Sequence, residues 1–148
     1  MLGDVAIFGN FSCGVDEKSR IILPAYTDAE KGDKVVFCIS DIGEDAIDLY
    51  PLSTISELIS RCDELILTST DDSIVARAKN EKRRLCGSTL VQTKVDAHRR
   101  LTVNPVVREI LGVDSDKYYG LGENDRIKLF SNEEKFKEYV GHSYVKKA

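Results

Sequence analysis

The residues best suited to chemistry form one short pattern, Asp-x-x-x-Arg, which occurs twice in the chain. The two copies and the cations beside them are Asp16, Lys18 and Arg20, then Lys94, Asp96, His98, Arg99 and Arg100. A loop with several cations can bind phosphates or the edge of a guanine base. An Asp four residues before an Arg can also serve only to tie a turn together. The spacing alone leaves these two interpretations open.

Motifs for catalysis and for metal binding are missing from the sequence. It contains no GxSxG, GxxxxGK[ST], GxGxxG or HExxH segment. The two histidines, His98 and His142, lie far apart, and neither has a cysteine within metal-ligand spacing. We therefore expect a protein that is not an enzyme and that holds neither a metal ion nor another cofactor.

Charge is unevenly distributed along the 148 residues. The net charge of −4 and the isoelectric point of about 5.3 argue mildly against a nucleic-acid partner. Acidic residues gather at Asp41, Glu44, Asp45 and Asp48, whereas basic residues gather in segments 77–84 and 94–108. A charged helix face is usually only a solvated face, and we prefer that interpretation for segment 77–84.

The cysteines and the apolar runs indicate the cellular compartment. Cys13, Cys38, Cys62 and Cys86 form no CxxC pair, so we expect reduced and mostly buried thiols, with Cys38 and Cys62 in the core. The longest apolar run has about five residues, far short of the ~20 that a membrane span needs. The first eleven residues lack the pattern of a signal peptide. We expect a cytoplasmic location without membrane contact.

The elements that carry the two Asp-x-x-x-Arg copies repeat at an offset of 80 residues. Val15–Leu23 aligns with Val95–Val103, and Ile47–Tyr50 aligns with Ile127–Phe130. One residue out of step, 55–59 resembles 136–140. We interpret the chain as two copies of one unit, residues 1–68 and 69–148.

Each unit is expected to be rich in strands and to end in a helix. Hydrophobic patterns predict strands over 5–11, 20–23, 34–39, 46–50, 88–93, 100–103, 118–121 and 126–130. They predict helices over 52–66, 72–86 and 132–140. Further signals are a Thr54–Glu57 capping box, a cap at Asp71 or Asp72, a helix end at Gly87, and turns at Gly43 and Gly122. Such small units interlock best as one α+β, mainly β, barrel with helices packed outside.

At this point the two motifs resemble a known family. Val15–Pro24 is similar to the Asp-x-Lys-Gly-Arg-(apolar)-x-(apolar)-Pro signature of MraZ proteins, and Val95–Pro105 is similar to their second copy. The resemblance implies tandem SpoVT-AbrB-like repeats, which form a swapped-hairpin barrel. It also implies a transcription factor of the nucleoid that binds direct repeats in the promoter of the division and cell-wall genes. Members of the family assemble as cyclic homo-oligomers.

The resemblance assigns roles to individual residues. Arg20 matches the arginine that contacts DNA, Lys18 the adjacent lysine, and Arg100 the arginine of the second copy. Asp16 and Asp96 match the acidic position that shapes the loop. The family glycine before the arginine is Ser19 in the first copy and Arg99 in the second. Because glycine reaches a positive φ at little cost, these replacements bear on the loop geometry. Arg108 fills the place of a later family arginine.

Two classes of function follow from the sequence. The first is a sequence-specific regulator that binds double-stranded DNA through Arg20, Lys18, Arg100, Arg99, His98 and Lys94. The alternative is a protein-interaction or oligomerisation module without a DNA role, either antitoxin-like or a scaffold. The acidic stretch from Asp41 to Asp48 would then be its partner surface.

Overall fold

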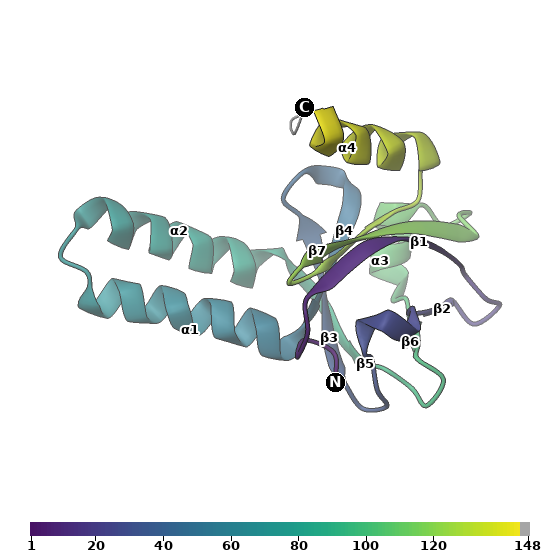
Figure 1. Cartoon of the computed structure of the whole chain (residues 1–148), viewed down its shortest axis with the longest axis horizontal. Coiled ribbons are helices and arrows are strands. Elements are labelled where there is room, and N and C mark those ends of the chain that lie inside the picture. Colours follow the sequence, from purple (N-terminus) through teal and green to yellow (C-terminus); the bar gives the residue numbers. More distant parts are fainter. Residues whose placement is uncertain (146–148) are drawn as a thin grey trace.

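The structure is a computed structural model that describes the backbone of residues 1–145 and their side chains, except those of residues 44, 45 and 142–145. His142, Glu44 and Asp45 therefore lie outside the described side chains. Within this part, strands and α-helices follow one another as β1 (Ile7–Gly14), β2 (Arg20–Ile22), β3 (Lys34–Ser40), β4 (Gly43–Pro51), α1 (Leu52–Thr68), α2 (Asp72–Ser88), β5 (Thr89–Lys94), β6 (Arg100–Thr102), α3 (Pro105–Leu111), β7 (Lys117–Asn124), β8 (Ile127–Phe130) and α4 (Glu133–Val145) (Figure 1). A short 3-10 helix, Ala25–Thr27, follows β2. The α+β class expected from the sequence is confirmed.

The strands form one antiparallel sheet of six and one ribbon of two. The large sheet has the order β1-β7-β8-β4-β3-β5, and the ribbon pairs β2 with β6. The order reads the same in reverse when β1 is exchanged with β5, β3 with β7 and β4 with β8. Strands β1 and β5 remain as edges among the described residues, so strand pairing does not close this sheet into the barrel that was expected.

The core lies between the inner face of the six-stranded sheet and the β2–β6 ribbon. Ile21 and Leu101 face each other across the ribbon, and both are fully buried in the main hydrophobic cluster. Helix α3 adds Val107 and Leu111 to the same cluster. The ribbon therefore has one face on the core. Because side chains alternate along a strand, the residues on either side of Ile21 and of Leu101 point outward.

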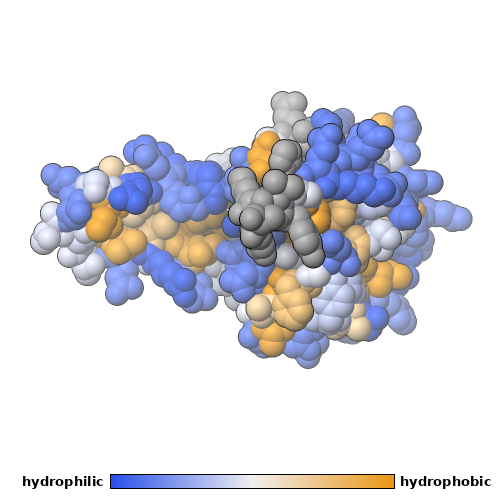
Figure 2. All heavy atoms as spheres, turned by 45° about the horizontal axis from the view of Figure 1, so that its top comes forward, coloured by the Kyte–Doolittle hydropathy of each residue, from blue (hydrophilic) through white to orange (hydrophobic). Residues whose placement is uncertain are grey.

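Helices cover the outer face of the large sheet at two places. Ile55 of α1 and Leu85 of α2 pack on β3 and β4. Phe136 of α4 packs edge-on against Phe130 of β8, with ring centroids 5.7 Å apart. Beyond the sheet, α1 and α2 continue as a projecting hairpin (Figure 1). Figure 2 shows apolar side chains along the middle of this hairpin, between hydrophilic rows. None of the described helices is long and apolar enough to cross a membrane.

Most element positions match the sequence expectations, but two expectations about the ends of helices α1 and α2 are wrong. Asp71 does cap α2, because its side chain accepts a hydrogen bond of 2.9 Å from Ser73 N. The expected Thr54–Glu57 capping box is wrong, since Pro51 precedes α1 and no side chain caps it. The helix end at Gly87 is also wrong, because α2 continues to Ser88.

Two further expectations in the second half need correction. Gly122 is not a turn residue but lies inside β7, where an added Cβ would stand 2.6 Å from Phe8 N of the paired strand. It is needed for close approach of backbones. Helix α3 was not expected at all: Asn104 caps it by accepting a 2.9 Å hydrogen bond from Val106 N, and Pro105 begins it.

Candidate nucleic-acid interface

The first Asp-x-x-x-Arg copy forms a closed loop that leads into β2. The Asp16 Oδ1 atom accepts hydrogen bonds of 2.9 Å from the backbone N–H groups of Lys18 and Arg20. Its Oδ2 atom accepts one of 2.8 Å from Arg20 Nε. Hydrogen bonds from the Arg20 backbone and side chain and from the Lys18 backbone lower the pKa of Asp16. Asp16 thus ties the loop together through three hydrogen bonds.

The second copy repeats the same hydrogen bonds with different side chains. Asp96 Oδ1 accepts from the N–H groups of His98 and Arg100 at 2.8 and 2.9 Å, and its Oδ2 accepts from Arg100 Nε at 2.7 Å. Desolvation acts to raise the pKa of Asp96, but these hydrogen bonds outweigh it and lower the pKa to about 2. Asp96 thus ties the second loop together in the same way.

The residue before each arginine keeps a left-handed backbone although it is not glycine. Ser19 has a φ of 59° and Arg99 a φ of 58°. Each loop is also tied to the strand of the other: Leu23 N donates to Arg99 O at 2.8 Å, and Val103 N donates to Ser19 O at 2.7 Å. These reciprocal bonds hold Ser19 and Arg99 in a conformation that glycine adopts more readily.

The two arginines of the pattern lie together on the outward face of the β2–β6 ribbon. Arg20 is opposite Thr102 and Arg100 is opposite Ile22, so the arginines are diagonal neighbours, about 7–8 Å apart at their Cα atoms. The Arg20 and Arg100 side chains are 24% and 28% exposed. In each, Nε is engaged by the aspartate of its own loop, while the terminal Nη groups carry the remaining donors.

The other predicted cations surround this ribbon unequally. Lys18 and His98 are exposed within the two loops. Arg99 is exposed too, but its Nε donates to Leu23 O at 3.3 Å, so part of its guanidinium serves the loop itself. Lys94 ends β5 and stands opposite Lys34 of β3. Like charges placed directly opposite each other repel, and an anion bound between them would relieve that repulsion.

Arg108, which fills the place of a family arginine, has a structural role. Its guanidinium donates to the carbonyl oxygens of Ser115 and Val113, both at 2.8 Å, and to Tyr118 Oη at 2.9 Å. The Tyr118 ring also lies beneath it, with 5.9 Å from the guanidinium carbon to the centroid. These contacts use the guanidinium to hold the turn after α3.

A buried cluster of charges was not predicted from the sequence. Lys128 of β8 donates to Asp48 Oδ1 and Asp41 Oδ1, both at 2.8 Å, and to Ser40 Oγ at 2.7 Å. Burial lowers the pKa of Lys128, but the two carboxylates raise it by more. Asp48 and Lys128 alternate with core residues, so they face the side of the sheet away from the ribbon. The sequence did hold a signal for this ion pair: Asp48 and Lys128 are 80 residues apart, so they occupy aligned positions of the repeat with opposite charges.

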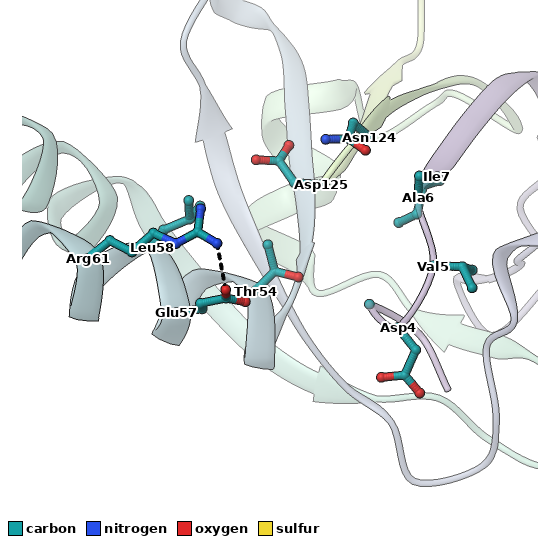
Figure 3. Close-up of a pocket in the computed structure, with 11 residues that line it drawn as sticks. Asp4, Val5, Ala6, Ile7, Thr54, Glu57, Leu58, Arg61, Asn124 and Asp125 are labelled. Atoms are coloured by element: carbon teal, nitrogen blue, oxygen red, sulfur yellow. Dashed lines mark hydrogen bonds and ion pairs between the residues drawn. The ribbon is translucent and has the colours of Figure 1, made fainter.

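The structure also contains a polar cavity and buried cysteines. A polar cavity of about 270 Å³ lies between the N-terminal segment, the start of α1 and the β7–β8 turn (Figure 3). Its wall includes the exposed Glu57–Arg61 ion pair at 2.7 Å and none of the predicted site residues. Cys38 and Cys62 are buried, as expected. In the part of the chain that the structure describes, no cluster of His, Cys, Asp and Glu side chains fits a metal ion.

No family model matches this chain, and no curated protein matches it. Functional inference therefore depends on the geometry of the two loops and on the resemblance of their motifs.

Proposed function

We propose that the chain is a sequence-specific, DNA-binding transcriptional regulator that resembles MraZ and binds through the β2–β6 ribbon and its two loops. One observation carries the proposal. Two arginines, each held at Nε by a loop aspartate, lie side by side on the outward face of a two-stranded ribbon. A ribbon of this width fits the major groove of DNA.

The aspartate of each loop accepts a hydrogen bond from the arginine Nε, so the Nη groups of that arginine can donate to a DNA base. A guanidinium donates two parallel hydrogen bonds to the O6 and N7 atoms of guanine, the commonest specific contact in the major groove. An aspartate that fixes the side chain beforehand reduces the conformational entropy lost on binding. Arg20 and Arg100 are therefore the proposed base-reading residues, supported by Asp16 and Asp96.

The remaining cations are proposed to bind phosphates. Lys18, His98, Arg99 and Lys94 occupy or flank the two loops at exposed positions. Removing one phosphate-binding cation should make affinity less dependent on salt: the negative slope of log affinity against log salt concentration should become shallower by about 0.9. The net charge of −4 opposes DNA at long range. A cyclic homo-oligomer, as in the family, would offset this by presenting several ribbons to successive direct repeats at high effective concentration.

The finer features of the fold belong to the same proposal. We propose two SpoVT-AbrB-like repeats, residues 1–68 and 69–148, interlocked as swapped hairpins. The palindromic strand order and the reciprocal bonds between the loops support this. The proposed site of action is the promoter of the division and cell-wall genes, in the cytoplasm at the nucleoid.

The decisive experiment is a fluorescence titration of Arg20→Ala against DNA from upstream of the chain's own gene. We expect a loss of about 5- to 150-fold in affinity, since a bidentate guanine contact contributes about 1–3 kcal/mol. Titrations against a scrambled duplex, at two salt concentrations, measure the part of the affinity that does not depend on DNA sequence. Arg61→Ala is the matched control, because Arg61 is an exposed arginine of α1 that pairs only locally with Glu57. It should bind like the original chain.

The outcomes separate the two classes of function. Full affinity of Arg20→Ala, with an unchanged melting temperature, would remove Arg20 from the interface. Equal and feeble binding of the unaltered chain to both duplexes would contradict the DNA proposal altogether. That result would favour a protein-interaction module. The expectation that the whole acidic stretch forms its surface is wrong, because Asp48 is buried against Lys128, so the exposed Asp41 is the residue to alter first.

A further inference from the structure

An exposed aliphatic side chain lies between the two arginines of the ribbon. Ile22 is 54% exposed, although its neighbours Ile21 and Leu23 are fully buried in the core. It stands directly opposite Arg100, and its counterpart Thr102 stands opposite Arg20. The outward face of the ribbon thus carries two guanidinium groups and two methyl-bearing side chains in a diagonal arrangement.

We infer that Ile22 is a specificity-determining residue that binds the 5-methyl group of a thymine about two base-pair steps from the guanine contacted by Arg20. Thr102 has the same role on the other strand of the ribbon, beside Arg100. The inference rests on the proposed function. Burial in the core does not account for Ile22, because alternation along β2 points it outward. Thymine offers the only methyl group in the major groove, and apolar side chains distinguish thymine by contact with it.

The spacing of the ribbon matches that of the bases. Residues two apart on a strand are separated by about 6.6–6.8 Å, which equals two base-pair steps of about 3.4 Å each. A β2 strand lying along the groove therefore brings Ile22 about two steps from the guanine bound by Arg20. Strand β6 is equivalent to β2 in the ribbon, so Thr102 lies at the same spacing from Arg100 as Ile22 does from Arg20. The preferred DNA site should thus contain a guanine and a thymine two base-pair steps apart. The preference for thymine should be stronger in the half of the site that Ile22 contacts than in the half that Thr102 contacts.

The test removes methyl groups from the DNA. The unaltered chain first selects its best duplex from a library with a randomised core of about 20 base pairs, at about 0.15 M salt. That duplex is then made with deoxyuridine in place of each thymidine in turn. We expect about a fourfold loss of affinity at one thymine, the typical value of one buried methyl group. Ile22→Ala should show a similar loss on the thymidine duplex and no sensitivity to deoxyuridine at that position.

Controls keep the result specific. Val106→Ala alters an equally exposed aliphatic residue, 50% exposed, on α3, and should retain the deoxyuridine effect. Ile22→Val keeps part of the side chain and should lie between the extremes. A selected duplex whose affinity is unchanged by every deoxyuridine would overturn the role of Ile22 and leave the DNA function intact. Failure to select any duplex over the starting library would instead overturn the proposed function.

Discussion

The loops 15–23 and 95–103 share six corresponding hydrogen bonds and differ at three successive side chains between the aspartate and the arginine. Glu17, Lys18 and Ser19 in the first loop are replaced by Ala97, His98 and Arg99 in the second. Segment 14–20 carries two acids and two bases, whereas the corresponding segment 94–100 carries one acid and three bases. Loop 15–23 is therefore neutral, and loop 95–103 together with the adjoining Lys94 has a net charge of +2, with His98 counted as neutral.

This contrast separates the residues that shape the loop from those that face a ligand. The aspartate and the reciprocal backbone bonds fix the path of the chain, so the side chains between them are free to change. The same halves meet on the other side of the sheet at Asp48 and Lys128, where corresponding positions carry opposite charges. The two halves thus share the same backbone arrangement at these positions but differ in the charge of their side chains.

The largest effect should come from breaking this charged contact. Lys128→Ala is expected to lower the free energy of unfolding by about 3–5 kcal/mol, because it leaves Asp48 buried without the ammonium group that donates to it. Urea unfolding measures the loss. Lys137→Ala is the control: Lys137 pairs with Glu133 at 3.2 Å but is 72% exposed, so the loss should stay below about 1 kcal/mol. Equal losses in both variants would contradict the distinction.

A second variant tests whether the charge itself stabilises the sheet. Replacing Asp48 and Lys128 together by leucine should recover much of the stability lost in Lys128→Ala, since an apolar pair needs no compensation for desolvation. A double variant as unstable as the single one would instead assign the loss to packing.

A smaller effect is expected from the left-handed residues of the two loops. Ser19→Gly should raise the free energy of unfolding by about 0.5–1 kcal/mol, because glycine relieves the positive φ at some cost in entropy. Arg99→Gly should gain less, since it also loses the Arg99–Leu23 hydrogen bond. Ser12→Gly in β1 is the control and should lose stability. Destabilisation by Ser19→Gly would show that the loop is not strained there.

The smallest effect concerns protons on the loop aspartates. Asp96 has a folded-state pKa of about 2, below the ~3.9 of an unfolded aspartate. Its contribution to stability is therefore complete above about pH 4 and is lost as the pH falls towards about 2. Carboxyl-carbon NMR titrations should show this for Asp96, and a lowered pKa for Asp16 as well. Titration of Asp96 near the ordinary pKa of an aspartate would contradict the hydrogen bonding described for its loop.

Local patterns predicted most of the elements and missed what depends on distant contacts. Alternation located the strands, and the offset of 80 residues related the two loops. Helix α3 has seven residues, too few for a helical period to stand out, and Pro105 indicated only the end of a strand. No local pattern specifies that β1 pairs with β7, because the choice of partner is made across the whole chain.

The candidate site shows the same division. Spacing offered the aspartate–arginine contact as one of two interpretations, since both partners lie within one turn of chain, and the structure contains that contact in both loops. The outward position of Ile22 depends on the register of β2 with β6 and could not be read from an apolar run. The bond from Arg99 to Leu23 joins residues 76 positions apart and was equally hidden.

The opposed charges of Asp48 and Lys128 also bear on how such a chain can evolve. On the proposed arrangement of two repeats, a chain with one repeat alone would have to dimerise with its own copy. Its strand corresponding to β4 or β8 would then pair with the same strand of the copy. Two carboxylates, or two ammonium groups, would face each other inside the protein. Once unlike charges occupied this position, the fused gene could no longer revert to a single unit without losing the fold.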